Sequence, residues 1–297
     1  MNTPVSDSGP VFRLVQLTGL TLISLLLFSL LTLLVVGGDL ESLRSLKMAQ
    51  LMQSIGIFFV PPLVLASVWS RRPASWLKLT IAPSWRKGLL VVLTMWSAIP
   101  AINLIGEWND GIQLPSSLAG LETALRVMEN EAEVMTERLL VMESWLDLIL
   151  TIGLVAIIPA LGEELFFRAT VQQLLQSTKA KHLAVWLTAI LFSFFHFQFY
   201  GFVPRMLLGA IMGYIMLWSG SLWYPVIAHF VNNATVVSFY FMEQRGWVSL
   251  DLENFGSATT AIAGYISIVV CVVMMLVVKK QFSVTIPEDE YEINSRE

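Results

Sequence analysis

The chain has 297 residues, of which 56% are hydrophobic and only 13% are charged, and its net charge at pH 7 is −4. A soluble domain carries about 25% charged residues, so this composition predicts a membrane protein, and nothing in it indicates nucleic-acid binding. The single cysteine, Cys271, excludes an intramolecular disulfide and a cysteine-based metal site.

Apolar runs long enough to cross a bilayer recur along the whole chain, since one spanning helix needs about 20 apolar residues. The runs lack the alternation of apolar and polar residues that marks the strands of a membrane barrel. The sequence therefore predicts an all-α, polytopic integral membrane bundle of about eight transmembrane helices. The predicted spans cover residues 14–36, 48–69, 89–105, 146 to about 175, 183–199, 206–218, 222–242 and 259–278.

Basic residues in the short loops predict how the chain is oriented, because cytoplasmic loops carry an excess of lysine and arginine. The loop after the second span is basic and is placed in the cytoplasm, whereas segment 107–143 is acidic and is placed outside. An even number of spans then puts both termini in the cytoplasm, and we expect a multi-pass protein of the plasma membrane. Arg205 is the exception, because it lies on the outer side.

Two segments do not have the composition of spans. Within residues 117–143, apolar and acidic residues recur at helical spacing, which predicts an amphipathic helix on the outer surface. That helix is either a solvated connection or a gate for substrate, and the spacing favours neither. The acidic stretch 287–297 is predicted to be disordered.

The fourth span contains two glutamates and an arginine within apolar sequence. Each ionised group near the bilayer centre costs about 2.5–3.5 kcal/mol, so such residues indicate function and require a partner. Glu164 and Arg168 are four residues apart and can pair on one helix face, whereas Glu163 is turned by about 100° and is the freer carboxylate. Pro159 leaves the Val155 carbonyl without its helical partner, which predicts a kink beside these residues.

Two later spans each carry a histidine. His196 lies in a phenylalanine-rich run, where a lone histidine is most often a neutral, hydrogen-bonded core residue. His229 and Asn233 share a helix face, a pattern that by itself is typical of hydrogen bonding between helices. Counted from the predicted cytoplasmic ends, Glu163 and His196 lie about 18–21 Å deep at the helical rise, whereas His229 lies less deep. Together, three separate spans place acid, imidazole and amide groups inside the membrane, which favours one shared site.

These residues form three ordered motifs that resemble the signature of the CPBP family of intramembrane proteases. The motifs are Glu-Glu-x-x-x-Arg at 163–168, Phe-x-x-x-His at 192–196 and His-x-x-x-Asn at 229–233. The family includes type II CAAX prenyl endopeptidases, bacteriocin-processing and Abi-type proteins, and lysostaphin-resistance-like proteins. The resemblance covers about residues 140–245. It divides the chain into N-terminal spans with the outer amphipathic segment (1–140), a catalytic core (141–245), and the last span with an acidic cytoplasmic tail (246–297).

The resemblance implies a catalytic site in which the residues have three roles. The first glutamate and the histidine of the second motif would activate a water molecule. The histidine and asparagine of the third motif would stabilise the tetrahedral oxyanion, to which a buried donor contributes about 2.7–4 kcal/mol. The second glutamate and the arginine would orient the site. The six implied residues are Glu163, Glu164, Arg168, His196, His229 and Asn233.

The sequence leaves open whether a metal takes part. Glu163, His196 and His229 would make a set of two histidines and one glutamate, as in catalytic zinc sites. Spacing cannot decide this because the ligands come from separate helices. Apart from a divalent metal such as zinc, no cofactor is expected. Neither His-Glu-x-x-His nor Gly-x-Ser-x-Gly, the signatures of other proteases, is present.

We therefore expect a hydrolase: an intramembrane endopeptidase that cleaves peptides or membrane-associated proteins. The alternative is a non-enzymatic immunity or scaffold protein that keeps the polar cluster as a brace. A proton-coupled transporter is a third hypothesis, but the sequence lacks paired repeats of interrupted helices. Gly209 and Gly213 favour close packing within the bundle and leave dimerisation as an alternative, so the oligomeric state is open. The substrate, including whether it is prenylated, is also open.

Overall fold

The computed structural model describes residues 8–37, 42–177, 180–249, 252 and 254–283, and within them the regular structure is helical. The predicted all-α class is therefore confirmed, while the acidic stretch 287–297 lies outside the described residues. The longer helices are α1 (Pro10–Val36), α2 (Leu43–Ser54), α3 (Val60–Trp69), α5 (Trp85–Asp110), α6 (Ala119–Leu139), α8 (Ile158–Phe166), α10 (Lys181–Phe194), α11 (Phe202–Ser219), α12 (Trp223–Gln244) and α13 (Ala261–Ser283). Short helices are α4 (Pro73–Trp76), α7 (Trp145–Thr151) and α9 (Gln173–Gln176).

Eight helical stretches correspond to the predicted spans. In the described part of the chain, six are long and apolar enough to cross a membrane: Pro10–Val36, Leu43–Trp69, Trp85–Asp110, Trp145–Gln176, Phe202–Ser219 and Ala258–Ser283. The other two are α10, which is apolar but has only 14 residues, and α12, which has 22 residues and carries several polar side chains. A prediction of about eight spans agrees with this arrangement.

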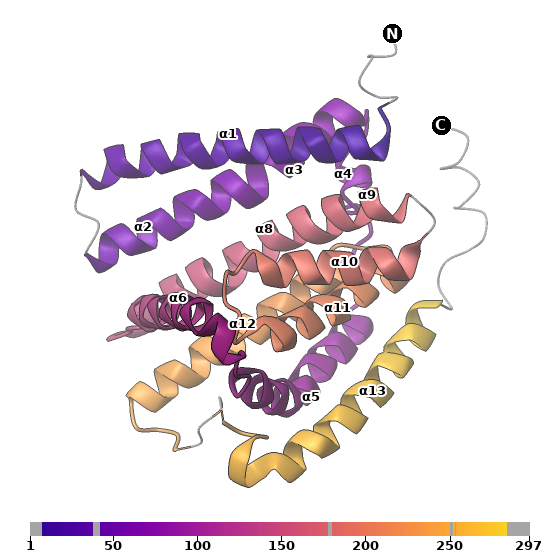
Figure 1. Ribbon diagram of the computed structural model, residues 1–297. Coiled ribbons are helices and arrows are strands. Elements are labelled where there is room, and N and C mark those ends of the chain that lie inside the picture. The colour runs from indigo at the N-terminus through magenta and orange to yellow at the C-terminus, as the bar shows by residue number, and fades with distance from the viewer. Residues whose placement is uncertain (1–7, 38–41, 178–179, 250–251, 253, 284–297) are drawn as a thin grey trace.

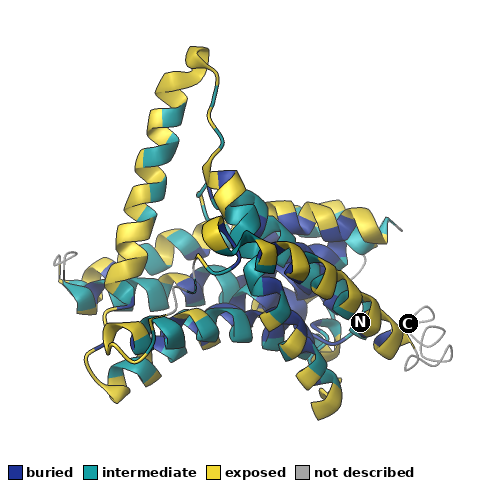
Figure 2. Ribbon diagram, turned by 90° about the horizontal axis from the view of Figure 1, so that it is seen from below, coloured by how far each residue is buried: buried dark blue, intermediate teal, exposed yellow. Residues whose placement is uncertain are grey.

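The long helices run roughly side by side, and α1 begins at the end of the bundle where α13 ends (Figure 1). α6 crosses this direction and is seen nearly end-on in the same view. Figure 2 shows α6 standing away from the bundle, and none of its residues is buried. The predicted helix within 117–143 is thus confirmed. On α1 and α13 large apolar side chains such as Leu26 and Ile262 are exposed, as is expected for helices that face lipid.

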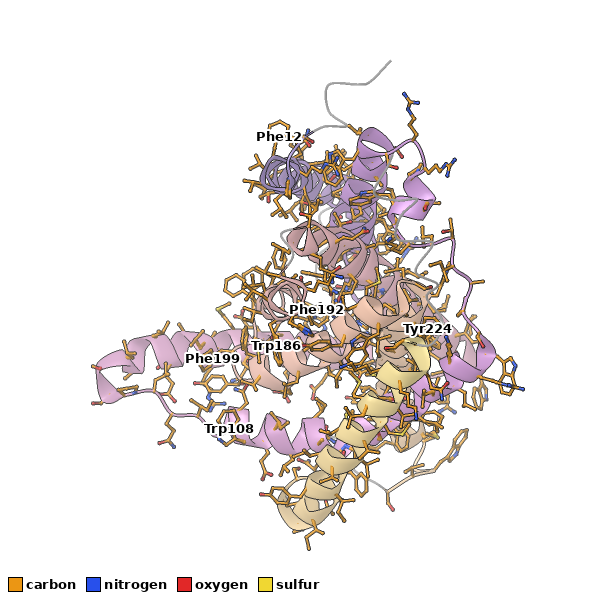
Figure 3. The ribbon with its side chains drawn as sticks, turned by 90° about the vertical axis from the view of Figure 1, so that its right-hand side faces the viewer. Phe12, Trp108, Trp186, Phe192, Phe199 and Tyr224 are labelled. Atoms are coloured by element: carbon orange, nitrogen blue, oxygen red, sulfur yellow. The ribbon has the colours of Figure 1, made fainter. Side chains whose placement is uncertain are left out.

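An aromatic core holds the fourth span against its neighbours. Phe167 packs edge-on against Phe192 of α10, with ring centroids 5.3 Å apart, and Phe192 lies in the middle of the bundle (Figure 3). Gly162 brings α8 close to the second span, because a Cβ at this position would lie 2.5 Å from the ring of Phe59. This close packing fixes the position of the two glutamates that follow Gly162.

The start of α12 lies inside the protein and not at its edge. The Leu222 amide donates to the Lys78 carbonyl at 3.0 Å, and Trp223 Nε1 donates to the Leu79 carbonyl at 2.9 Å. Leu222 is only 1% exposed, so the segment that contains Lys78 and Leu79 covers this end of the helix. α12 thus begins beneath this segment, and the contact of His229 with Glu164 at 2.9 Å places His229 level with the two glutamates of the fourth span.

Candidate active site

The fourth span changes its winding on both sides of the two glutamates. A π-helix over Ile152–Ile157 precedes α8, and a second over Phe167–Gln172 follows it. π-Helical segments are rare in proteins overall, but those that occur are often found at functional sites. Pro159 cannot donate to the Val155 carbonyl, and this carbonyl accepts instead from Asn233 Nδ2 at 3.1 Å. The irregular backbone of this span is thus joined directly to α12.

Glu164 is the centre of a buried ion cluster. Its Oε1 atom lies 3.1 Å from Arg168 Nη1 and accepts a hydrogen bond from His229 Nδ1 at 2.9 Å. Glu164 and Arg168 have no exposed surface. Arg168 Nη2 also donates to the Gly209 carbonyl at 3.2 Å, so one pair of charges connects the fourth span to α11 and α12. The expected pairing of Glu164 with Arg168 is present, and His229 is its third member.

Glu163 points to the other side of the same imidazole. Its Oε2 atom lies 4.0 Å from His229 Nε2, too far for a hydrogen bond. Within the described residues this buried oxygen has no hydrogen-bond partner. His229 is therefore flanked by two carboxylates, with Glu164 holding Nδ1 and Glu163 facing Nε2.

His196 lies in the turn just after α10, because the helix ends at Phe194 and does not continue to residue 199 as predicted. The chain turns there with Phe197 in the left-handed region, at φ 54°. His196 Nδ1 bonds to the Phe192 carbonyl at 2.8 Å. Since a carbonyl only accepts, Nδ1 carries the hydrogen, and Nε2 is left as an acceptor when the ring is neutral.

The predicted residues converge on one cavity of about 260 Å³. Four of the six line it: Glu163, His196, His229 and Asn233. The other two, Glu164 and Arg168, lie behind this surface and contact the cavity only through His229 and the helix backbone. Carboxylate, imidazole and amide groups from the fourth span, the turn after α10 and α12 therefore face a common space large enough for water and a peptide group.

Two residues that sequence reasoning missed also line this cavity, Arg205 and Asn232. Arg205 Nη2 donates to Gln198 Oε1 at 2.8 Å, whereas Nη1 is buried and has no hydrogen-bond partner within the described residues. Its guanidinium packs on Gly201, where a Cβ would lie 2.9 Å from Nη2. A signal for Arg205 was present, because it is a basic residue in a loop that the predicted orientation places outside.

The three residues proposed from sequence as metal ligands do not form a complete set here. The part of the chain that the structure describes contains no group of three or more His, Cys, Asp or Glu side chains placed to hold a metal ion. Nδ1 of His229 is hydrogen-bonded to a carboxylate, and Nδ1 of His196 is hydrogen-bonded to a backbone carbonyl. Histidines that bind metal through Nε2 show the same pattern, so it does not distinguish the two roles. The metal set stays a prediction.

Comparison with known protein families gives an independent result. Residues 145–235 match the family model described as type II CAAX prenyl endopeptidase Rce1-like. This match supports membership of the CPBP family, whose motifs it contains. No curated protein and no solved structure matches it significantly.

The CPBP match covers the fourth span, α10, α11 and the first half of α12. It includes all three motifs and every residue predicted for the site. The match supports an integral membrane protein with protease activity of the CAAX type. The match leaves the role of each side chain to be argued from geometry.

Proposed function

We propose that this CPBP protein is an intramembrane endopeptidase that hydrolyses peptide bonds of membrane-associated or peptide substrates. The observation that carries the proposal is the convergence of Glu163, His196, His229 and Asn233 on one cavity. A non-enzymatic brace would account for the Glu164–Arg168 pair. It gives no reason for Glu163 to keep a buried oxygen without a partner beside an imidazole.

Glu163 is proposed as the general base. A water molecule at about 2.8 Å from both partners fits between Glu163 Oε2 and His229 Nε2, which are 4.0 Å apart. Glu163 takes a proton from this water as its oxygen attacks the peptide carbonyl carbon. His196 Nε2 is a second acceptor on the same cavity and would orient the water. When the C–N bond breaks, the proton on Glu163 passes to the leaving amine.

The oxyanion requires donors that are fixed before the reaction. Asn233 keeps one amide hydrogen for this purpose, since its Nδ2 group has two and Val155 accepts only one. His229 donates from Nε2 when its ring carries a second proton, with Nδ1 held by Glu164. The unpartnered Nη1 of Arg205 is a third donor group on the cavity. Glu164 and Arg168 act through His229, whose ring they orient.

Glu163→Gln tests this assignment, because it keeps the size of the side chain and removes the base. Purified wild-type and variant protein are incubated with a mixture of synthetic peptides, and products are identified by mass spectrometry. We expect wild-type protein to cleave and Glu163→Gln to lose cleavage while keeping its thermal stability. Glu131→Gln, an exposed change on α6, is the control and should cleave normally. Cleavage by Glu163→Gln would refute the proposal, and a preserved cellular phenotype in that variant would favour the immunity or scaffold alternative.

Two finer points belong to the same proposal. The basic loop after the second span supports an orientation with both termini in the cytoplasm of a plasma-membrane protein. A divalent metal at Glu163, His196 and His229 is tested by dialysis against a chelator. Loss of cleavage with recovery on adding zinc would assign these residues as ligands, whereas undiminished cleavage would assign them to direct acid–base and hydrogen-bonding roles.

A further inference from the structure

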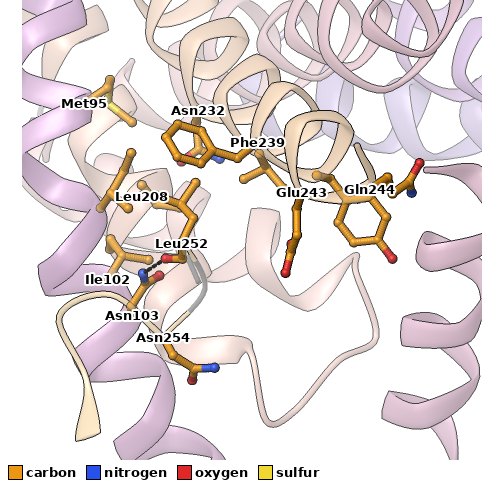
Figure 4. Close-up of a pocket in the computed structure, with 13 residues that line it drawn as sticks. Met95, Ile102, Asn103, Leu208, Asn232, Phe239, Glu243, Gln244, Leu252 and Asn254 are labelled. Carbon is orange, nitrogen blue, oxygen red and sulfur yellow. Dashed lines mark hydrogen bonds between the residues drawn. The ribbon is translucent and has the colours of Figure 1, made fainter. Parts of the chain in front are cut away.

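A second and larger cavity, of about 500 Å³, adjoins the candidate active site. Four residues line both cavities, so the two spaces meet at a shared wall: Met95, Ile102, Leu208 and Asn232. The larger cavity continues from this wall between α5 and α12 toward the end of α12. Figure 4 shows its lining side chains. A chain bound across the catalytic cavity would therefore have a continuous path into the larger one.

One stripe of α12 runs along the whole path. It contains His229, Asn232, Val236, Phe239 and Glu243, which are separated by steps of three or four residues and so share a helix face. Fourteen residues separate His229 from Glu243, or about 21 Å at the helical rise. An extended peptide covers that distance in about six residues, at about 3.3 Å per residue.

The lining of the larger cavity mixes apolar side chains with asparagines such as Asn103 and Asn254, and it is acidic at its far end. Met95, Leu208 and Phe239 face the part nearest the catalytic cavity, and the Glu243 carboxylate points into the space (Figure 4). Glu243 is the one charged side chain among the described lining residues. No ion pair holds it within the described chain.

The neighbours of Glu243 are already engaged elsewhere. Gln244 Nε2 donates to the Leu140 carbonyl at 3.1 Å, and its Oε1 accepts from the Met142 amide at 3.2 Å. Arg245 donates to the Glu143 carbonyl on another side of the helix. Asn103, on the opposite wall, donates to the Leu252 carbonyl at 2.7 Å. The carboxylate of Glu243, which no ion pair among the described residues engages, is thus available to a ligand at this end.

We propose that the larger cavity binds the substrate polypeptide in extended form, with a basic residue about six positions from the scissile bond paired to Glu243. The inference rests on the proposed function, because it takes the catalytic cavity as the point of cleavage. Apolar substrate residues between the scissile bond and the basic one would lie against the apolar wall. An exposed ion pair gives up to about a fivefold preference.

The test uses synthetic peptides with a constant apolar sequence in which one lysine or one glutamate is placed at each position in turn. Mass spectrometry of the products gives the distance from that residue to the bond that is cut. With wild-type protein we expect about fivefold enrichment of cuts about six residues from lysine. Glu243→Lys should transfer the preference to glutamate. Glu133→Lys, an exposed charge change on α6, should leave it unchanged. Cleavage with no charge preference, or a preference that Glu243→Lys does not reverse, would overturn the inference while leaving the protease proposal intact.

A binding measurement tests the same inference without depending on catalysis. The Glu163→Gln variant is titrated with fluorescently labelled lysine and glutamate peptides, with and without Glu243→Lys, and anisotropy is measured. A preference for lysine that reverses with Glu243→Lys supports the binding site, even if no protein in the series cleaves and the proposed function fails. Binding that is insensitive to charge in both backgrounds would indicate that lipid or detergent fills the cavity and would overturn the inference.

Discussion

Glu164 and His229 are joined by a hydrogen bond of 2.9 Å that connects the fourth span to α12. The same glutamate oxygen lies 3.1 Å from Arg168, so one buried carboxylate both compensates a buried cation and orients an imidazole. The position of His229 in the cavity depends on this group, although Glu164 itself does not line the cavity.

Glu164→Gln should destabilise the protein strongly, because it leaves the fully buried Arg168 without a counter-charge. Breaking one partner of a buried ion pair costs about 3–5 kcal/mol. Thermal unfolding in detergent measures the effect, with Glu131→Gln on α6 as the exposed control. If both variants unfold at the wild-type temperature, the buried pair does not support the fold.

Asn233→Ala should reduce cleavage about 10²–10³-fold, the usual effect of losing one oxyanion donor. It also removes the bond to Val155, so stability must be measured in parallel. Asn232→Ala is the comparison: it leaves the bond to Val155 in place and removes only the bond of 3.1 Å from Asn232 Nδ2 to Asn233 Oδ1, so it should reduce cleavage less. If Asn233→Ala raises KM and leaves kcat unchanged, Asn233 does not act as an oxyanion donor.

Gly201→Ala should lower cleavage about tenfold to a hundredfold by displacing the Arg205 guanidinium, since small misplacements in an active site have effects of this size. A Cβ at Gly201 would lie 2.9 Å from Arg205 Nη2, whereas at Gly120 on α6 it would meet nothing within 4 Å. Gly120→Ala should therefore cleave at the wild-type rate. Equal rates for the two variants would remove Arg205 from the proposed mechanism.

Gly213→Ala should destabilise the bundle, whereas Gly19→Ala should stabilise α1 by up to about 1 kcal/mol through helix propensity. A Cβ at Gly213 would lie 2.9 Å from Val185 Cγ1, whereas at Gly19 it would meet nothing within 4 Å. Overpacking of this kind costs about 1–3 kcal/mol. Size-exclusion chromatography reports the oligomeric state and thermal unfolding reports stability, so together they distinguish packing within the bundle from a dimer contact. A variant of Gly213 that changes oligomeric state at constant stability would point to a dimer contact.

Most of the fold was predictable because apolar length alone identifies a spanning helix. The Glu164–Arg168 pair was predictable for a similar reason, since a four-residue spacing places two side chains on one helix face. The freedom of Glu163 followed from the same helical geometry.

Three features depended on contacts between segments and could not be predicted. The end of α10 at Phe194 has no local signal, because the phenylalanine-rich sequence continues beyond it. The Lys78 segment that covers the start of α12 is remote from it in sequence, so its contact with Leu222 could not be expected from helix spacing. The partner of Glu164 on α12 is remote in sequence, so helix spacing could assign Arg168 to it but not His229.

The bond between Asn233 and Val155 has a consequence for how this chain can vary. Pro159 leaves the Val155 carbonyl to be satisfied from α12. The preceding amide, that of Ile158, bonds to the Gly153 carbonyl in π-helical register, so the Asn233 side chain completes a stretch of backbone that regular α-helical bonding does not satisfy. A substitution at Asn233 therefore removes two things at once, a donor on the cavity and a contact that holds the irregular part of the fourth span against α12.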